Sequence, residues 1–468
     1  MLMRFATVCV SLLCGVTPLA AQSPAPTIDW DSLGAEAVRN LSAYLAVNTA
    51  NPPGNELAAA RFLQQLLARD GIEAQILDTA ELGPGRANLY ARYHSGGGKK
   101  AIALVNHMDV VPVTPQFWSV DPFAGAVKDG YVWGRGALDM KGEGIVQAMA
   151  LIALKRSGVT LDRDIVFIGN ADEEVGGNGA VVFVQRHPDL LRDVEFLMTE
   201  GGDNLVDHGT LAYYGVGVAE KRTFWQRITV RGVASHGSRP TKQNPVPRLI
   251  AALNRLAHYE TPLHVTPGVA RYFHDLAPQY AGRQRVWLSD VTAALKQPAA
   301  RTWMTDNVYW NAILRNTISL TVLSGSNKTN VIPSQASAEI DIRLLPDQDT
   351  GAVRAELVRV VGDTAVHWET MYPPKAPLES PIDTDLFRAI VRAAHDRDPG
   401  AQVTTPMLTG ATDRPTYRAL GLVTYGFDPF KTEQADAQHG VHGNDERVSV
   451  ANLGFGVHYL YDVLRYVQ

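Results

Sequence analysis

Residues 101–112 read AIALVNHMDVVP, and this stretch decides the fold class. The apolar run 101–105 has the length of a buried strand, and the polar residues His107 and Asp109 follow it directly. Helical stretches such as 144–155 separate further apolar runs of the same kind, at 165–168, 196–198 and 422–425. Strands that alternate with helices predict an α/β fold with a mostly parallel central sheet. Ligands bind such sheets beyond the carboxyl ends of the strands, where these polar residues are expected.

Helices are predicted on both sides of these strands along the chain. Helical spacing of apolar residues favours one helix over residues 31–47 and a second helix that carries Ala59 and Leu63. The turn Asn51-Pro52-Pro53-Gly54 separates the two. A last helix is predicted from the apolar spacing of Leu453, Val457, Leu460 and Leu464.

The middle of the chain has a different pattern, which predicts a second domain. Half-exposed strands are expected where apolar residues alternate with polar ones, at 224–230, 316–323 and 336–343, and a helix is expected at 245–258. We interpret residues 220–344 as a small α+β domain inserted into a catalytic domain made of residues 28–219 and 345–468. Residues 261–311 are poorly patterned and are interpreted as an extension of the insert. Three of its tryptophans are expected in the core or around an apolar pocket: Trp225, Trp303 and Trp310.

Length, composition and charge exclude several classes of protein. With 468 residues the chain is too long for one ordinary core, which favours two or three lobes. Hydrophobic residues make up 46% and charged residues 19%, as in soluble globular proteins. The net charge of -5 gives no reason to expect binding to nucleic acid or to an anionic membrane.

The first 21 residues have the features of a secretory signal peptide. A short basic head precedes an apolar run over residues 5–16, and small residues follow at Ala20 and Ala21. We predict cleavage after Ala21 and a secreted or periplasmic protein, with a retained membrane anchor as the alternative. Because both cysteines, Cys9 and Cys14, lie in this leader, any transition-metal site must use His, Asp and Glu.

Five short motifs near strand ends or in glycine-rich loops supply such residues. Each motif alone is typical of a turn or a solvated loop, but together they bring one candidate metal ligand apiece. The motifs are Asn106–Pro112, Gly134–Gly142, Asn170–Gly177, Thr199–Gly202 and His439–Arg447, and the ligands are His107, Asp139, Glu174, Glu200 and His442. Carboxylates with imidazoles form a suitable ligand set for zinc.

The same motifs suggest a division of chemical roles. The carboxylate of Asp139 is expected between two metal ions, with one oxygen on each. Asp109 is expected to accept a hydrogen bond from the His107 ring and so fix its tautomer. Glu173 is expected to face a water held between the ions and to act as its general base.

In these motifs the chain resembles the di-zinc metallopeptidases that include aminoacylase, carboxypeptidase S, glutamate carboxypeptidase, acetylornithine deacetylase and succinyl-diaminopimelate desuccinylase. Glu200 and the closing motif around His442 are most similar to the carboxypeptidase S-like branch. The resemblance implies that His107, Asp139 and Glu200 hold one zinc ion and that Asp139, Glu174 and His442 hold the other. Cobalt or manganese are alternative metals. One extra residue in the closing motif leaves His439 as a second candidate ligand.

The resemblance also assigns roles outside the metal ligands. It implies that the inserted domain is a lid that forms the interface of a homodimer. His236, in ASHGS, would stabilise the oxyanion, often in the partner's site, and Asn330 and Arg343 would bind the substrate carboxylate. Gly410, in TGATD, matches a substrate-binding position. Relatives often place an arginine two residues after the aspartate of that motif, where this chain has Pro415.

The implied function is zinc-dependent hydrolysis of an amide or peptide bond next to a free carboxylate. The substrate would be a small peptide, with an N-acyl amino acid, as for aminoacylase, as the alternative. A non-catalytic binding protein on the same scaffold is a third reading, which the presence of Glu173 and of every expected ligand disfavours. A related zinc aminopeptidase would not need the motif around His236.

Overall fold

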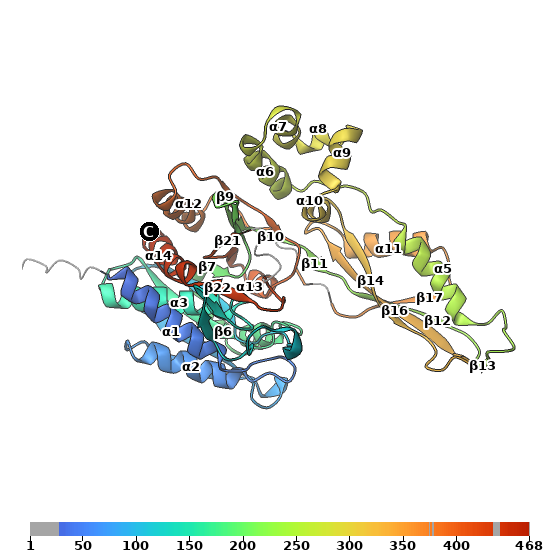
Figure 1. Ribbon diagram of the computed structural model, residues 1–468, viewed down its shortest axis with the longest axis horizontal. Helices are drawn as coiled ribbons and strands as arrows, with labels where there is room; N and C mark the ends of the chain where they lie inside the picture. Colours follow the sequence, from blue (N-terminus) through green and yellow to red (C-terminus); the bar gives the residue numbers. More distant parts are fainter. Residues whose placement is uncertain (1–27, 374, 377–378, 434–439, 468) are drawn as a thin grey trace, which may run out of the picture.

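The computed structural model describes residues 28–373, 375–376, 379–433 and 440–467, and it confirms the α/β fold. The predicted signal peptide lies outside these residues and stays a prediction. A ten-stranded sheet, here called the main sheet, forms the body of the protein (Figure 1). Its strands lie in the order β1-β2-β6-β3-β7-β20-β9-β8-β21, and β18 also pairs with β9.

The four apolar runs predicted as buried strands form the centre of the main sheet. They are β3 (Lys99–His107), β6 (Arg163–Asn170), β7 (Val194–Thr199) and β20 (Val423–Phe427), and they run parallel. The flanking strands are β1 (Ala74–Asp78), β2 (Ala87–Tyr93), β8 (Asn204–Asp207), β9 (Thr210–Gly217), β18 (Val403–Thr404) and β21 (Lys431–Glu433). Because the central strands are parallel, their carboxyl ends meet at one edge.

Helices cover both faces of the main sheet, and the alternation along β3 shows why. Ile102 and Leu104 join a core with α1 (Trp30–Leu45), α2 (Glu56–Ala68), α3 (Lys141–Ser157), α12 (Asp385–Arg397) and α14 (Val450–Tyr466). Ala101, Ala103 and Val105 join a second core with α4 (Asn178–Arg186) and α13 (Arg414–Arg418). Within the part of the chain that the structure describes, no helix is long and apolar enough to cross a membrane.

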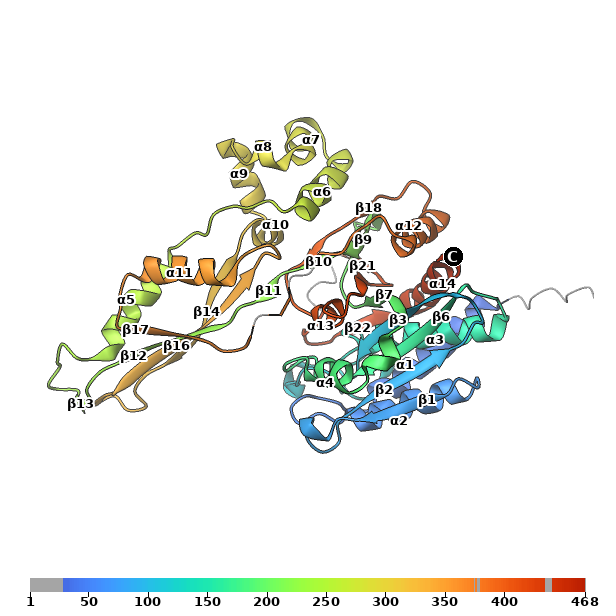
Figure 2. The same ribbon diagram turned by 180° about the vertical axis from the view of Figure 1, so that it is seen from behind.

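A separate five-stranded sheet extends from the main body as an arm (Figures 1 and 2). It contains β11 (Arg222–Thr223), β12 (Gln226–Arg231), β14 (Thr317–Ser324), β16 (Gln335–Leu344) and β17 (Val366–Thr370). Two helices, α5 (Pro245–Ala257) and α11 (Thr350–Val361), pack with its buried residues in a core of their own. A two-stranded ribbon of β13 (Ser235–His236) and β15 (Val331–Ile332) belongs to the same unit. We call residues 222–258 and 317–370 the small-sheet unit.

The predicted end of the insert at residue 344 is wrong. Strand β17 pairs with β12 over five residues, and α11 packs on α5, so the small-sheet unit continues to Thr370. The chain crosses back to the main body afterwards, where Ser380 N–H donates to the carbonyl of Val218. The alternation at Val366 and Trp368 is the signal that was missed.

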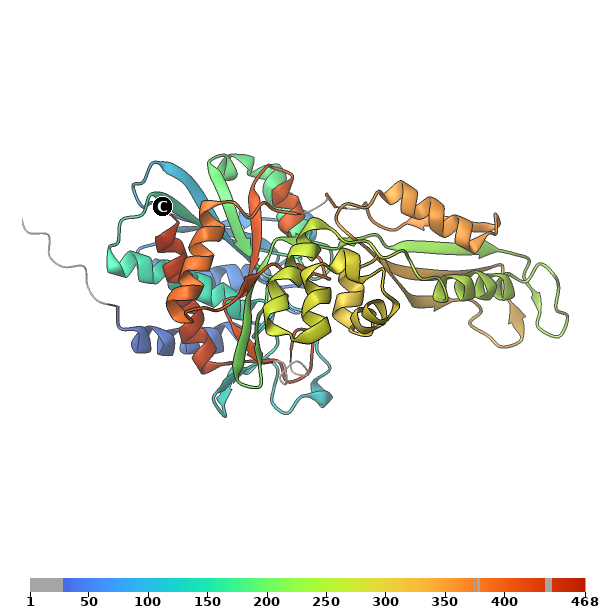
Figure 3. The same ribbon diagram turned by 90° about the horizontal axis from the view of Figure 1, so that it is seen from above.

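The interpretation of residues 261–311 as an extension of the insert is also wrong. Residues 267–313 form a block of short helices, here called the helical block: α6 (Pro267–Leu276), α7 (Gly282–Ser289), α8 (Val291–Ala294), α9 (Pro298–Thr305) and α10 (Val308–Ile313). Its buried residues, such as Phe273 and Met304, join the core of the main body and not that of the small-sheet unit. Figure 3 shows the block beside the base of the arm. These helices are only four to ten residues long, so their apolar residues show too little periodicity for the helices to be predicted from the sequence.

Candidate metal centre

The candidate ligands lie together at the edge where the central parallel strands end. His107 is the last residue of β3, and Glu200 follows β7 directly. Asp139 comes from the loop before α3, and Glu173 and Glu174 come from the loop after β6. Possible ligand atoms lie within 4.8 Å of one another in two groups: His107, Asp139 and Glu174, and His107, Glu173 and Glu200.

The His107 ring is held so that one nitrogen is left for a cation. Its Nδ1 lies 2.9 Å from the backbone carbonyl of Asp109, which can only accept, so Nδ1 carries the hydrogen. In the neutral ring the lone pair of Nε2 then faces the Asp139 carboxylate at 2.8 Å, with Glu200 at 4.0 Å. Electron-rich atoms at these distances need a positive charge between them. A proton on Nε2, which the raised pKa of His107 favours, or a metal ion in its place supplies that charge.

The Asp139 carboxylate lies between the two histidines. Oδ1 faces His107, and Oδ2 lies 3.2 Å from Nε2 of His442. The same His442 nitrogen lies 3.1 Å from Glu174 Oε2, while Glu174 Oε1 is buried with no hydrogen-bond partner among the described residues. One oxygen toward each imidazole, with a carboxylate beside each, is a donor set that fits two metal ions. The second candidate, His439, lies outside the described residues.

Asp109 supports this loop in a different way from the one expected. Its carboxylate is 3.7 Å from His107 Nδ1, and the backbone carbonyl of the same residue takes the ring hydrogen bond. The carboxylate accepts instead from the backbone N–H groups of Glu173 (3.1 Å) and Glu174 (3.2 Å). Asn51 donates to it as well, at 2.8 Å. Asp109 therefore fixes the position of both glutamates.

Two further groups support the site, and sequence reasoning gave them no role. Glu446 is fully buried, and its two oxygens accept from Arg135 and from the backbone N–H groups of Gly136, Leu138 and Asp139. It thereby ties the His442 loop to the Asp139 loop. Asp172, the first acid of the run 172–174, is paired with buried Arg86, which also contacts Glu56 at 3.0 Å. The position of Asp172 beside Glu173 was the only feature of the sequence that pointed to a role for it.

Burial and mutual repulsion make the carboxylates costly without a cation. Burial raises the pKa of Glu173 well above its usual range, and the charge of Glu200 raises it further. Burial and then Asp139 raise the pKa of Glu200 to about 8. Burial alone would also raise the pKa of Asp139, but hydrogen bonds from His107 and His442 outweigh it and hold this pKa below its ordinary value. A cluster of this kind is most stable when positive charge is bound inside it.

The raised pKa of Glu200 predicts an opposite pH response with and without metal. In the metal-free protein this carboxyl binds its proton more tightly than in the unfolded chain, where its pKa is 4.5. Its contribution to stability is therefore present below about pH 4.5 and is lost as the pH rises towards 8. We expect the melting temperature of chelated protein to fall between about pH 5 and 8, and metal to abolish this fall because it binds the ionised carboxylate. The prediction is wrong if the melting temperature changes with pH in the same way with and without chelator.

Three residues given roles by resemblance do not join the metal cluster within one chain. His236 lies on β13, at the end of the small-sheet unit farthest from the main sheet (Figure 1), and its ring is exposed. Asn330 lies beside it, since its carbonyl accepts from Gly237 N–H at 2.8 Å. Arg343 lies on β16, where its guanidinium bonds Asp341 at 2.8 Å and lies over the ring of Trp225.

The segment around Gly410 does lie in the main body, and it explains the unusual position of its arginine. Gly410 is half-buried, and Asp413, three residues on, accepts from Asn170 at 2.8 Å, beside the loop of Glu173. Arg414 is fully buried and pairs with Glu220 at 3.0 Å. This arginine therefore holds Glu220 at the base of the arm, and its own guanidinium is not free for substrate.

Several known proteins are similar in sequence to this chain over most of its length. Human N-fatty-acyl-amino acid synthase/hydrolase PM20D1 is 28% identical over 396 residues, which cover 81% of this chain and 76% of that protein. Pig aminoacylase-1 is 27% identical over 420 residues, covering 88% and 91%. Probable carboxypeptidase S-like 2 of Dictyostelium discoideum is 27% identical over 380 residues, covering 78% and 71%.

Solved structures share the fold. An M20 family metallo-carboxypeptidase from Sulfolobus solfataricus superposes with a TM-score of 0.71 at 16% identity, covering 92% of this chain and 99% of that one. Human carnosine dipeptidase 1 gives a TM-score of 0.70 at 17% identity, covering 94% and 97%.

The clustered ligands and these relatives define a hydrolase of the metallopeptidase and amidohydrolase class. Residues 103–466 match the sequence profile of Peptidase family M20/M25/M40, and the chain belongs to this family. Resemblance to aminoacylase and carboxypeptidase S, expected from the motifs, is confirmed.

Proposed function

We propose that this protein uses two zinc ions to hydrolyse an amide or peptide bond next to a free carboxylate. The observation that carries the proposal is the Asp139 carboxylate, which presents one oxygen to His107 and the other to His442 beside Glu173. His107, Asp139 and Glu200 would hold one ion, and Asp139, Glu174 and His442 the other. When bound, the ions supply Lewis acidity that polarises the scissile carbonyl and acidifies the attacking water.

The side chains of this chain would carry the protons. Glu173 has no role in the ligand set and lies within reach of the same cluster, so its carboxylate is placed to take a proton from the attacking water. It would then pass that proton to the nitrogen of the leaving amine, which departs as the free amino group. The environment that raises the pKa of Glu173 makes it a better base for this transfer.

We also propose that a second copy of the chain completes the site. His236 Nδ1 accepts the backbone N–H of Ser238 at 3.2 Å, so the hydrogen of the neutral ring is on Nε2, which is free to donate to an oxyanion. Because β13 lies far from the main sheet, this donor would serve the site of a partner (Figure 1). Among the described residues β14 pairs only with β16, so its other edge is unpaired there, and the side chains of Val322 and Leu323 on this strand are exposed. Such an edge suits pairing with β14 of a second copy.

The shared site predicts complementation between two inactive variants. Glu173→Gln and His236→Ala should each have little activity alone, but a mixed dimer contains one site with both residues intact. Equal co-expression should restore activity in about a quarter of all sites, because half of the dimers are mixed and each has one complete site. Turnover by the purified mixture is the measurement. Glu173→Gln co-expressed with the double variant is the matched control, and recovery no higher than this control would show that His236 does not act across subunits.

The carboxylate specificity can be tested with a panel of dipeptides and N-acyl amino acids, each paired with its C-terminal amide. Release of product by zinc-loaded protein is followed by mass spectrometry. We expect turnover of free acids and at least tenfold less of the amides, because the free carboxylate is held by a charge-assisted contact. Relatives named as an N-fatty-acyl-amino acid hydrolase, an aminoacylase and a dipeptidase support both halves of the panel. Equal turnover of acids and amides would show that the enzyme does not require a free carboxylate.

A further inference from the structure

A cavity lies between the helical block and the edge of the main sheet, close to the metal centre. Its volume is about 490 Å³, within the range of small-molecule sites. Gly202, two residues after Glu200, and Thr409, directly before Gly410, both line it. Two residues span at most about 7 Å, so the wall of the cavity at Gly202 lies within about that distance of the backbone of Glu200.

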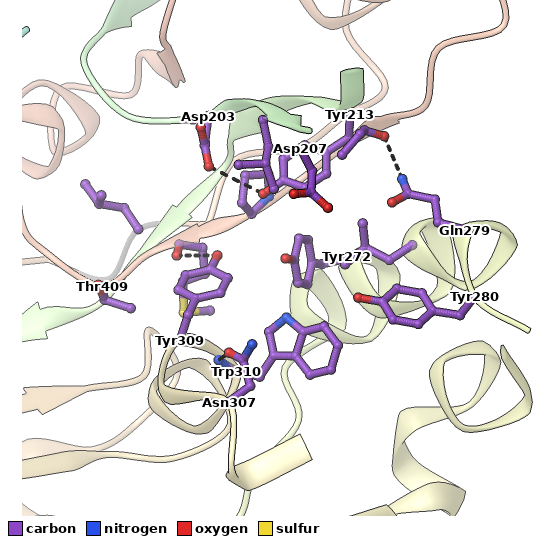
Figure 4. A pocket seen from close by; sticks show the side chains of 17 residues that line it. Asp203, Asp207, Tyr213, Tyr272, Gln279, Tyr280, Asn307, Tyr309, Trp310 and Thr409 are labelled. Carbon is purple, nitrogen blue, oxygen red and sulfur yellow. Dashed lines mark hydrogen bonds between the residues drawn. The ribbon is translucent and has the colours of Figure 1, made fainter. Parts of the chain in front are cut away.

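The walls of the cavity are aromatic. Tyr272 contacts Tyr213 and Tyr309 edge to face, with ring centroids 6.4 and 6.0 Å apart, and Tyr280 and Trp310 complete the wall from the helical block. Figure 4 shows these side chains around a common space. The Tyr309 hydroxyl donates to the Met407 carbonyl at 3.0 Å, which fixes its ring. Trp310 thus lines a cavity, while Trp303 packs behind it at 5.2 Å and Trp225 lies in the small-sheet unit.

The charge of the cavity is negative. Asp203 and Asp207 line it, and no lysine, arginine or histidine is among the described residues that do so. The Asp203 carboxylate lies 3.5 Å from the Tyr213 hydroxyl and faces the same space (Figure 4). Burial raises the pKa of Asp203 to about 6, so the group is ionised at neutral pH. An alkyl chain in this cavity would take water away from a carboxylate without replacing it, which is costly.

We infer that this cavity binds a cationic group at the acyl end of the substrate, such as an ammonium or a guanidinium. Aromatic faces attract cations, and a carboxylate beside them adds an ion pair. The gain is largest where water is largely excluded, as it is around the half-buried Asp203 and the buried Tyr272. The inference rests on the proposed function, since it assumes that the amide is held at the metal centre. It distinguishes this chain from an enzyme that selects fatty acyl chains.

Two matched substrates test the inference on the zinc-loaded protein. N-(6-aminohexanoyl)-phenylalanine and N-heptanoyl-phenylalanine have chains of the same length and differ by an ammonium in place of a methyl group. We expect kcat/KM to be at least about tenfold higher for the ammonium compound. Asp203→Asn should remove most of this preference, and Asp207→Asn, at the exposed rim, should reduce it without affecting the fold. Asp306→Asn, an exposed acid of the helical block outside the cavity, removes the same charge and should leave the preference unchanged.

A preference for the heptanoyl compound, equal rates, or an unchanged preference in Asp203→Asn would overturn the inference. Failure of the proposed function is distinguishable, because neither compound would then be hydrolysed. In that case calorimetric binding of the same two compounds still decides. Tighter binding of the ammonium compound that depends on Asp203 supports a cation site, and equal or absent binding overturns it.

Discussion

Replacing Glu173 with glutamine should lower kcat by about 10²–10⁴-fold while both metal ions stay bound. Glutamine has the same shape as glutamate but cannot accept the proton of the attacking water. The backbone N–H of residue 173 would still donate to Asp109, so the loop that carries Glu174 should keep its position. The prediction therefore separates proton transfer from metal binding.

The measurement combines kcat with metal content by mass spectrometry on the same samples. Glu173→Asp is the matched control, since it keeps a carboxylate on a shorter arm and should retain more activity than the glutamine variant. If Glu173→Gln binds two ions and keeps more than a tenth of the wild-type kcat, the general base is another group.

Replacing Asp139 with asparagine should remove both metal ions together. Among the described residues, this carboxylate alone faces both histidines, and an amide has one oxygen where the carboxylate has two. Loss of Lewis acidity costs several kcal/mol of transition-state stabilisation, and 1.36 kcal/mol is tenfold in rate, so activity should fall by about 10³-fold or more.

Single-site variants provide the comparison for Asp139→Asn. Glu200→Gln should weaken the ion near His107, and His442→Asn should weaken the ion near Glu174, so each should retain about one ion per chain. Equilibrium dialysis with zinc gives the stoichiometry. If Asp139→Asn keeps one tightly bound ion, this aspartate does not bridge two sites.

The sequence predicted the central sheet because its strands are buried on both faces. Such strands are continuous apolar runs, and all four runs identified became neighbouring parallel strands. Since their carboxyl ends share one edge, the residues following them, such as His107 and Glu200, were expected to lie together, and the structure brings them together. The alternating strands β12 and β16 were predicted for a related reason, because each has one covered face. Strand β14 forms as predicted, but Leu320 and Val322, expected on a covered face, are exposed in this chain.

Long-range contacts between polar groups could not be predicted from the sequence. Nothing in the local pattern shows that Glu446 reaches the loop of Asp139, more than 300 positions earlier, or that Arg414 pairs with Glu220. The prediction for the helical block failed for a different reason. Its short helices pack on the main body through scattered aromatic residues such as Phe273 and Trp310. The cavity that these helices enclose could not be placed without their positions.

Titration of zinc into chelated wild-type protein, with bound metal and initial rate measured in each sample, is the most direct test of whether hydrolysis needs two metal ions. Separate series with cobalt and manganese identify the metal that gives the highest rate. We expect that two ions bind per chain and that the rate rises to its full value only as the second ion binds. Full activity with one ion per chain, or with none, would contradict it.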